Sequence, residues 1–237
     1  MDYENFLELV KKRRSIRSFK ADPIPDDYID KIIEAARWAP SGFNLQPWEF
    51  VVVKNQELRK GIVQYLRDFM ATSGPLEATR ESWQGPKPPA GAPTPPLGFA
   101  NAPVFIIPFG DIRFRVGLPM IHRYNEESWD RTYTSTMASA FLYMHLAATS
   151  LGLASQWVSA VTQPTVHCLI KQLLGIPAPL KIYDMLALGY PDVKPAPRLV
   201  RSREEMVHYD FCGEDDFKND EQVKDFIFRI RNPKVSP

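Results

Sequence analysis

The sequence predicts an α/β or α+β protein in which helices pack against one sheet. Apolar residues recur at helical spacing over residues 26–38, which indicates an amphipathic helix. Two short apolar runs, 50–53 and 104–107, each consist of three β-branched residues and one Phe. Such runs are typical of buried strands. Because such strand-like runs alternate with helical stretches along the whole chain, a single sheet covered by helices is expected.

Each element follows from its local pattern. Pro40 ends the helix over 26–38, and Gly152 and Gly175 end two later helices in the manner of C-terminal glycines. The helix ending before Gly152 is apolar on all sides, which predicts a central buried element. The expected helices are residues 3–13, 26–38, 58–69, 136–151, 166–174 and 220–230, and the expected strands are 50–53, 104–107, 154–159 and 183–188.

Composition indicates an ordinary globular chain and excludes several classes. The 237 residues are 44% hydrophobic and 24% charged with a net charge of +1, so no nucleic-acid or membrane partner is expected. The N-terminus lacks a signal-peptide pattern and no apolar run is long enough to span a bilayer. Cys168 and Cys212 form no CxxC pair and have no metal-ligand histidine spacing, so we expect two buried, reduced thiols, no metal and a cytoplasmic protein.

Residues 84–99 hold six prolines and three glycines and cannot form a regular helix or a central strand. Two interpretations stay open: a surface excursion without regular structure, or a lid over a site. Residues 220–230 carry an amphipathic pattern, which predicts a terminal helix that docks on its own domain or on a second subunit.

Arg13, Arg14, Ser15 and Arg17 form the densest cluster of anion-binding side chains in the chain. A guanidinium group binds phosphate through two parallel N–H donors, and the serine hydroxyl adds a further donor. Taken alone, the cluster is also compatible with a solvated basic helix end. A second segment, residues 39–48, combines turn residues with the amides of Asn44 and Gln46, which suit the alternating donors and acceptors of a planar heterocycle.

Together these segments resemble the nitroreductase family of FMN-dependent oxidoreductases. The matching pieces, in order, are RRSIR, APSGFNLQPWEFVVV, NAPV, LGLASQWVS, LGYP and EEMVHY. The resemblance covers about residues 5–210. It implies an α+β fold with a central, mostly antiparallel sheet flanked by helices, and an intertwined homodimer with FMN at the interface.

The resemblance also implies a set of cofactor-binding residues. Residues 13–17 would hold the FMN phosphate, ribityl chain and pyrimidine carbonyl. The turn within residues 39–48 would reach FMN from the other subunit, and the strand over 154–159 would lie against the isoalloxazine. These residues are Arg13, Arg14, Ser15, Arg17, Pro40, Ser41, Gly42, Asn44, Trp157, Val158 and Ser159, with Arg198 and Arg201 completing the phosphate site. Phe43, Tyr124 and Trp129 are candidates for the substrate wall.

The organisation implied is an FMN-binding domain over residues 1–210, with a lid or substrate excursion at 73–131, and a C-terminal arm at 211–237. The implied activity is NAD(P)H-dependent reduction of nitroaromatics, quinones or similar electron-poor small molecules by ping-pong hydride transfer through flavin N5, with no catalytic side chain required.

Several alternatives stay open. The segment 122–126 loosely resembles iodotyrosine deiodinase-like members, which favours a reductive dehalogenase, although residues 65–100 show no recognisable acidic, tyrosine and lysine clamp for an amino acid. Trp157 to Ser159 resemble the flavin-destroying members, but Ser15 stands where those carry an acidic residue. A flavin-binding storage protein without turnover is the alternative from a different class.

Overall fold

A computed structural model describes residues 2–85, 87, 89, 91, 93–195 and 198–231. The chain divides into two compact units, Met1–Phe69 with Pro96–Pro195, and Met70–Pro95 with Ala196–Pro237. Four residues of the predicted excursion 84–99 and the last six of the predicted arm 211–237 lie outside the described residues. The predicted boundary at residue 210 stays a prediction.

The first unit is built on an antiparallel five-stranded sheet, in agreement with the expected α+β class. Its strands are β1 (Trp48–Val53), β2 (Val104–Asp111), β3 (Ala154–Val158), β4 (Leu180–Ile182) and β5 (Met185–Gly189). The order is β1-β2-β5-β3, and β4 pairs with β2 beyond the end of β5. The predicted strand 183–188 corresponds to β5, which begins at Met185; Tyr183 and Asp184 separate it from β4, a strand that was not predicted.

Side chains alternate between the two faces of the sheet and build two apolar cores. Val104 and Ile106 of β2 face the core shared with α2 (Asp26–Arg37) and α5 (Glu126–Ser150). Phe105 and Ile107 face the opposite core, shared with α3 (Gln56–Ser73) and α6 (Pro164–Leu174). The sheet is therefore a middle layer between two pairs of helices, as the apolar runs of its strands require.

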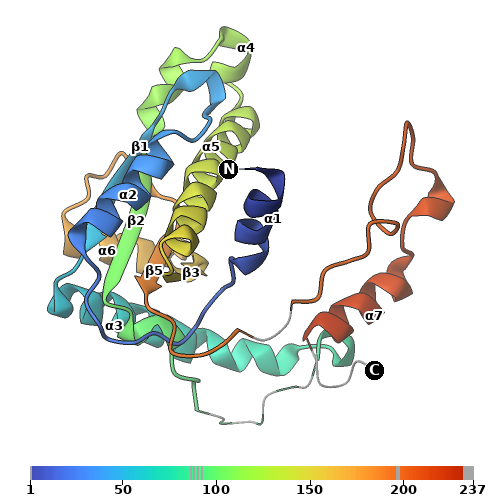
Figure 1. Cartoon of the computed structure of the whole chain (residues 1–237), viewed down its shortest axis with the longest axis horizontal. Coiled ribbons are helices and arrows are strands. Elements are labelled where there is room, and N and C mark those ends of the chain that lie inside the picture. Colours follow the sequence, from blue (N-terminus) through green and yellow to red (C-terminus); the bar gives the residue numbers. More distant parts are fainter. Residues whose placement is uncertain are drawn as a thin grey trace. The chain divides into compact units, whose positions relative to one another are not determined.

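The central helix α5 is longer than predicted. It begins at Glu126, where the side chain of Asn125 accepts the amide of Ser128 as an N-cap. Met137, Phe141 and Met144 are fully buried, whereas Leu142 and Tyr143 are 44% and 38% exposed. The helix α1 (Tyr3–Lys12) lies alongside α5 and has no buried residue (Figure 1). These neighbouring helices leave apolar side chains uncovered within one chain.

The second unit joins two segments that are distant in sequence. Residues 74–84 form the short helices η2 (Gly74–Thr79) and η3 (Ser82–Gln84), and the late segment contributes η7 (Glu214–Asp216) and α7 (Asp220–Arg231). The helix α7 packs against η3, and Arg231 donates to the carbonyl of Gln84 at 3.3 Å. The predicted terminal helix therefore docks on its own chain.

Two further findings concern the expectations from composition. Among the described residues, no helix is long and apolar enough to cross a membrane. The expectation of buried thiols is wrong, because Cys168 and Cys212 are both exposed. Cys168 lies on the outer face of α6 and Cys212 lies in a loop, so neither reaches a core.

Candidate cofactor site

The cluster Arg13–Arg17 lies against the free edge of the sheet. The amide of Ile16 donates to the carbonyl of Ser155 at 3.2 Å, and Ser15 pairs with Ser155 as an isolated parallel bridge. Ile16 is only 5% exposed, because its side chain enters the core between the sheet and α3. The cluster is therefore an added edge segment beside β3, anchored by one buried side chain.

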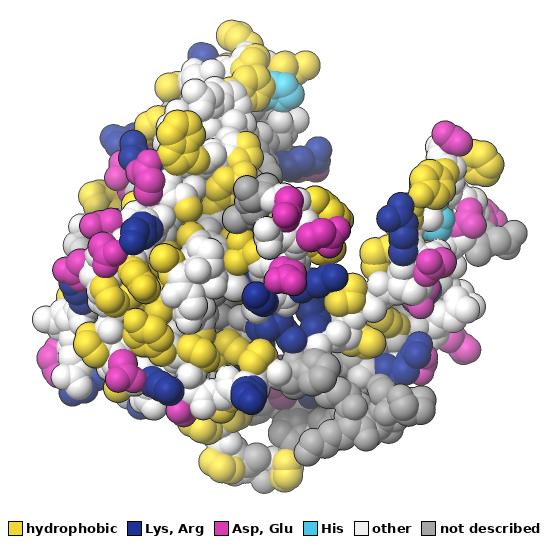
Figure 2. Space-filling model, in the orientation of Figure 1, with side chains coloured by type: hydrophobic (Ala, Val, Ile, Leu, Met, Phe, Trp, Pro, Cys, Tyr) yellow, Lys and Arg dark blue, Asp and Glu magenta, His cyan; other side chains and the backbone are white. Residues whose placement is uncertain are grey.

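This anchoring turns the polar side chains outward. In an extended segment alternate residues point to opposite sides, so burial of Ile16 exposes Ser15 and Arg17. Arg13 and Arg14 are half-buried at the end of α1. Figure 2 shows lysine and arginine side chains gathered beside the C-terminal end of α1. The edge of β3 thus presents several donors suited to an anion.

A buried histidine lies behind the cluster. Nδ1 of His145 is 2.7 Å from Oγ of Ser155, the residue that pairs with Ser15, and its ring stacks on Trp157. Burial, together with the positive charge of Arg13, lowers the pKa of His145 to about 3. Its Nε2 is buried and has no hydrogen-bond partner among the described residues. The imidazole is therefore neutral at pH 7 and links α5 to β3, the strand that the edge segment joins.

Trp157 is held from a second side. Its Nε1 donates to Oδ2 of Asp184 at 2.6 Å, and Asp184 stands at the break between β4 and β5. Burial raises the pKa of Asp184 to about 6, and the indole donor partly opposes this shift. The indole is 39% exposed although it touches Phe141, His145 and Tyr183. Trp157 therefore offers an ordered aromatic edge at the surface of the unit.

Gly98 is a site residue that sequence reasoning missed. A Cβ at this position would lie 1.9 Å from the carbonyl oxygen and 2.9 Å from the Cβ of Arg17. Gly98 begins η4 (Gly98–Asn101) just after the proline-rich stretch. Only glycine allows that segment to lie so close to the arginine cluster. The signal in the sequence is the third glycine of the 84–99 segment, which composition alone assigns to a loop.

The turn of residues 40–46 adopts an unusual backbone. Phe43, Asn44 and Gln46 have φ angles of 54°, 53° and 47°, in the left-handed region. Each such residue costs of order 1–3 kcal/mol, and clusters of them occur at functional sites. The Ser41 hydroxyl accepts the amide of Gln46, and the amide side chain of Gln46 donates to Oδ1 of Asn44. The predicted polar turn is thus internally bonded and fixed in shape.

The turn is seated on α5. The amide of Gly42 donates to Oγ1 of Thr136 at 3.0 Å, and a Cβ on Gly42 would lie 2.4 Å from Cγ2 of Thr132. The arginine cluster instead reaches α5 near His145, nine residues further along. At 1.5 Å per residue the two attachment points are about 13 Å apart along the helix. The two predicted parts of the cofactor site therefore occupy different levels of one chain.

The candidates for the substrate wall separate into two groups. Phe43 is 57% exposed with its ring centroid 6.0 Å from that of His122, and Tyr124 is 77% exposed. Trp129 is only 6% exposed and packs on Tyr133 in the core between α2 and α5. Its side chain is part of the apolar stripe of α5, and its assignment to a substrate wall stays a prediction.

Arg198 and Arg201 belong to the second unit. Arg201 donates to the carbonyl of Glu205 at 2.5 Å, pairs with its carboxylate, and lies over the ring of Phe226. Arg198 is exposed. Their assignment to a phosphate stays a prediction.

The donor chemistry of the edge segment fits the cofactor that the resemblance implies. A flavin mononucleotide needs cationic donors for its phosphate and a firm surface for its ring. Arg13, Arg14 and Arg17 supply the cations, and the unpartnered Nε2 of His145 supplies a polar atom behind them. Trp157 to Ser159 continue the same edge.

The fold and the donor chemistry of the edge segment are compatible with a flavin-dependent oxidoreductase, and comparison with known proteins gives the family. The profile described as "Nitroreductase family" matches residues 10–190. The chain therefore belongs to the nitroreductase family, a family of oxidoreductase enzymes.

The relatives carry two kinds of name. The chain is 32% identical over 205 residues to iodotyrosine deiodinase 1 of Rattus norvegicus, covering 81% of this chain and 64% of that protein. It is 27% identical over 188 residues to a provisionally named NADH dehydrogenase/NAD(P)H nitroreductase of Archaeoglobus fulgidus, covering 79% and 86%. The chain thus spans somewhat less than two thirds of the deiodinase.

A solved structure supports the same fold. An FMN-dependent nitroreductase from Clostridium difficile R20291 superimposes with a TM-score of 0.63 at 23% identity, covering 87% of this chain and 99% of that one.

Proposed function

We propose that the protein is an FMN-dependent NAD(P)H oxidoreductase that reduces electron-poor small molecules and acts as a homodimer. The observation that carries the proposal is the bond between Ile16 and Ser155. It joins the arginine cluster to β3, so that phosphate donors and Trp157 to Ser159 share one edge. The names of the nitroreductase relatives favour a nicotinamide donor and FMN.

The roles of this chain's residues follow from their positions. Arg13, Arg14 and Arg17 would neutralise the phosphate, and the backbone and side chains of residues 157–159 would support the ring. Bound FMN would carry electrons between nicotinamide and acceptor as hydride. A nearby guanidinium would stabilise negative charge that develops on the pyrimidine part of the ring.

A second copy of the chain would complete the site. The turn of residues 40–46 is about 13 Å along α5 from the arginine cluster, so one chain offers the two parts at separate places. Uncovered apolar side chains on α1 and α5 support a dimer: Tyr3, Phe6, Leu142 and Tyr143 are 69%, 47%, 44% and 38% exposed. Light scattering of Leu142→Asp should show a monomer where the unchanged protein shows a dimer.

The first test is the cofactor itself. The purified protein should be yellow, and mass spectrometry of the released pigment should identify FMN. Arg13→Ala and Arg17→Ala should lose FMN on dialysis, whereas Arg37→Ala, an exposed arginine paired with Glu34, should retain it. Colourless protein that cannot be reconstituted with FMN would overturn the proposal.

The electron donor is tested next. Anaerobic addition of NADH and of NADPH should bleach the flavin absorbance with at least one of them. If neither bleaches a correctly loaded protein, the flavin-storage alternative or a different donor replaces the nicotinamide part of the proposal.

Reductive dehalogenation is the second candidate function. The 32% identity to rat iodotyrosine deiodinase 1 favours it. A panel of nitroaromatics, quinones and halotyrosines, with released halide measured by ion chromatography, separates the two. Halide release faster than nitro or quinone reduction would make the dehalogenase the better description.

A further inference from the structure

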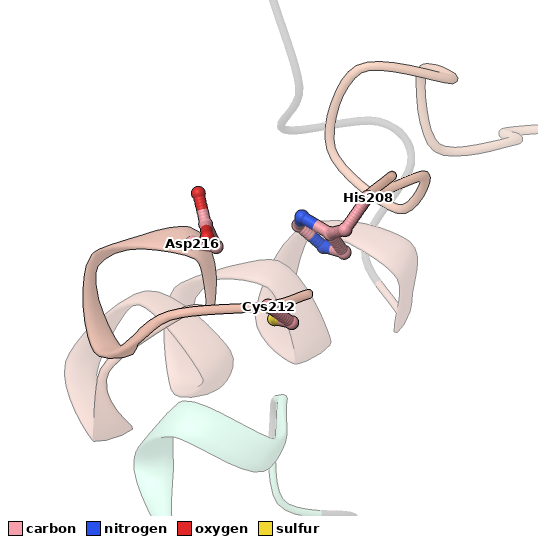
Figure 3. Close-up of side chains that lie close together, drawn as sticks. All are labelled: His208, Cys212 and Asp216. Carbon is pink, nitrogen blue, oxygen red and sulfur yellow. The ribbon is translucent and has the colours of Figure 1, made fainter. Parts of the chain in front are cut away.

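We propose that His208, Cys212 and Asp216 form a binding site for a zinc ion in the second unit. One ligand atom from each residue lies within 4.8 Å of the other two (Figure 3). The three side chains come from one short loop and η7, and all are exposed. The family resemblance includes only His208 of the three, within EEMVHY, and assigns it no role; the flavin site uses none of them, so the proposal is independent of the proposed function.

Two local turns bring the three residues together. Asp210 has a φ of 67°, and the amide of Phe211 donates to the carbonyl of Tyr209 at 2.8 Å. This tight reversal returns the chain from His208 toward Cys212. Aspartate is among the few residues that adopt the left-handed region readily, so the reversal fits the residue present.

The second turn positions the carboxylate. The amide of Gly213 donates to Oδ2 of Asp216 at 2.7 Å, and the amide of Asp216 donates to the carbonyl of Gly213 at 3.1 Å. One carboxylate oxygen is thus oriented by the loop, and the carboxylate keeps further lone pairs for a cation. Glu205 pairs with both Arg201 and Lys218, so neither of these ion pairs uses the carboxylate of Asp216.

The donor set selects the class of metal. A thiolate sulfur, an imidazole nitrogen and a carboxylate oxygen suit zinc, whereas magnesium and calcium prefer oxygen ligands alone. Zinc–ligand bonds of about 2.0–2.3 Å require ligand atoms about 3.5 Å apart in a tetrahedron. The three side chains are exposed and no core packing holds them. Rotation of these side chains therefore brings their ligand atoms from the present distances, within 4.8 Å, to those of a zinc site.

The site has room for a fourth ligand. His208 and Asp216 also line a cavity of about 470 Å³ whose walls include Phe217 and Phe226. Three protein ligands and one open position is the arrangement of a zinc ion that keeps a water or an added ligand. We infer that the ion ties the loop of residues 208–216 into one rigid segment.

The experiment uses the purified full-length protein after treatment with a chelator. Addition of Zn²⁺ should protect Cys212 from alkylation while Cys168, the other exposed cysteine, stays reactive; mass spectrometry of the two peptides reads this directly. Mg²⁺ should protect neither. Protection of both cysteines, or of neither, would overturn the site.

Affinity and ligand identity are measured with Zn²⁺ titration and with Co²⁺ as a spectroscopic substitute. Cys212→Ser should remove the cobalt–thiolate absorption, which is measured in difference spectra so that any bound pigment is subtracted. His208→Gln and Asp216→Asn should weaken Zn²⁺ binding on the order of 100-fold. Cys168→Ser is the matched control and should bind as the unchanged protein. Equal binding by all four variants would refute the assignment, and circular dichroism confirms that each variant is folded.

Discussion

The indole Nε1 of Trp157 donates to Oδ2 of Asp184 across a distance of 2.6 Å, joining β3 to the break between β4 and β5. Trp157 pairs with Leu186 in the sheet register, so Asp184 reaches it from the position just before the first residue of β5. A single irregularity in the sheet thus supplies the acceptor that orients the aromatic edge of the candidate cofactor site.

Asp184→Asn should change how stability depends on pH. Burial raises the pKa of Asp184 from 3.8 to about 6, so the native state binds this proton more tightly than the unfolded chain does. The stabilisation from the protonated form is complete below about pH 4 and is lost as pH rises through 6. Denaturant unfolding at pH 4.5 and pH 7 should show that the variant gains stability relative to the unchanged protein at the higher pH. If the difference in unfolding free energy between the variant and the unchanged protein is the same at both pH values, the raised pKa of Asp184 is contradicted.

His145→Gln should reveal a dependence of opposite sign. Burial lowers the pKa of His145 from 6.5 to about 3, so the unfolded chain binds the proton more readily. Its contribution is present above pH 6.5 and is lost as pH falls below that value. The variant should lose less stability than the unchanged protein between pH 7 and pH 5 in the same unfolding assay. An equal loss in both proteins would show that His145 is not the group responsible.

Gly42→Ala should destabilise the protein by about 1–3 kcal/mol, because its Cβ would lie 2.4 Å from Cγ2 of Thr132. Thr132→Ser removes that methyl group and keeps the hydroxyl that donates to Ser128. The double variant should therefore recover much of the lost stability in thermal unfolding. Failure of the second substitution to rescue the first would place the cost in the backbone of the turn instead.

Gly98→Ala should weaken FMN retention, because its Cβ would lie 1.9 Å from the carbonyl oxygen of Arg17 and force the arginine cluster to move. Gly74→Ala is the control, since a Cβ there meets nothing within 4 Å. The flavin remaining after dialysis is measured by absorbance for both variants. Equal retention would show that the cluster tolerates displacement.

Much of the fold could be predicted because periodicity reports burial directly. Most helices and strands of the first unit lie where the apolar spacing predicts them. The majority of their boundaries agree within a few residues. The start of α5 is not predicted, because its apolar residues Trp129 and Tyr133, four residues apart on one face, are surrounded by polar residues. Trp129 is instead interpreted as part of a substrate wall. The strand over 183–188 was predicted two residues too early, because Tyr183 and Asp184 directly precede the apolar residues of β5, and the short strand β4 was not predicted.

The site was predictable in its parts and not in its assembly. Residue types predicted the anion-binding cluster, and local pattern predicted the strand of Trp157. The resemblance added their roles toward FMN, whereas their junction through Ile16 and Ser155 depends on tertiary pairing. Gly98 escaped notice because closeness to Arg17 is a property of two distant segments. His208, Cys212 and Asp216 follow no familiar metal spacing, since it is the reversal at Asp210 that brings the first two together.

The packing of α7 on η3 has a consequence for the order in which the protein is made. The excursion that holds Gln84 leaves the ribosome well before Arg231, its partner in the second unit. At about 5–20 residues per second the interval is on the order of ten seconds. During translation the early segment stays without its packing partner for this interval, so the second unit assembles only after all residues of the first unit have been made.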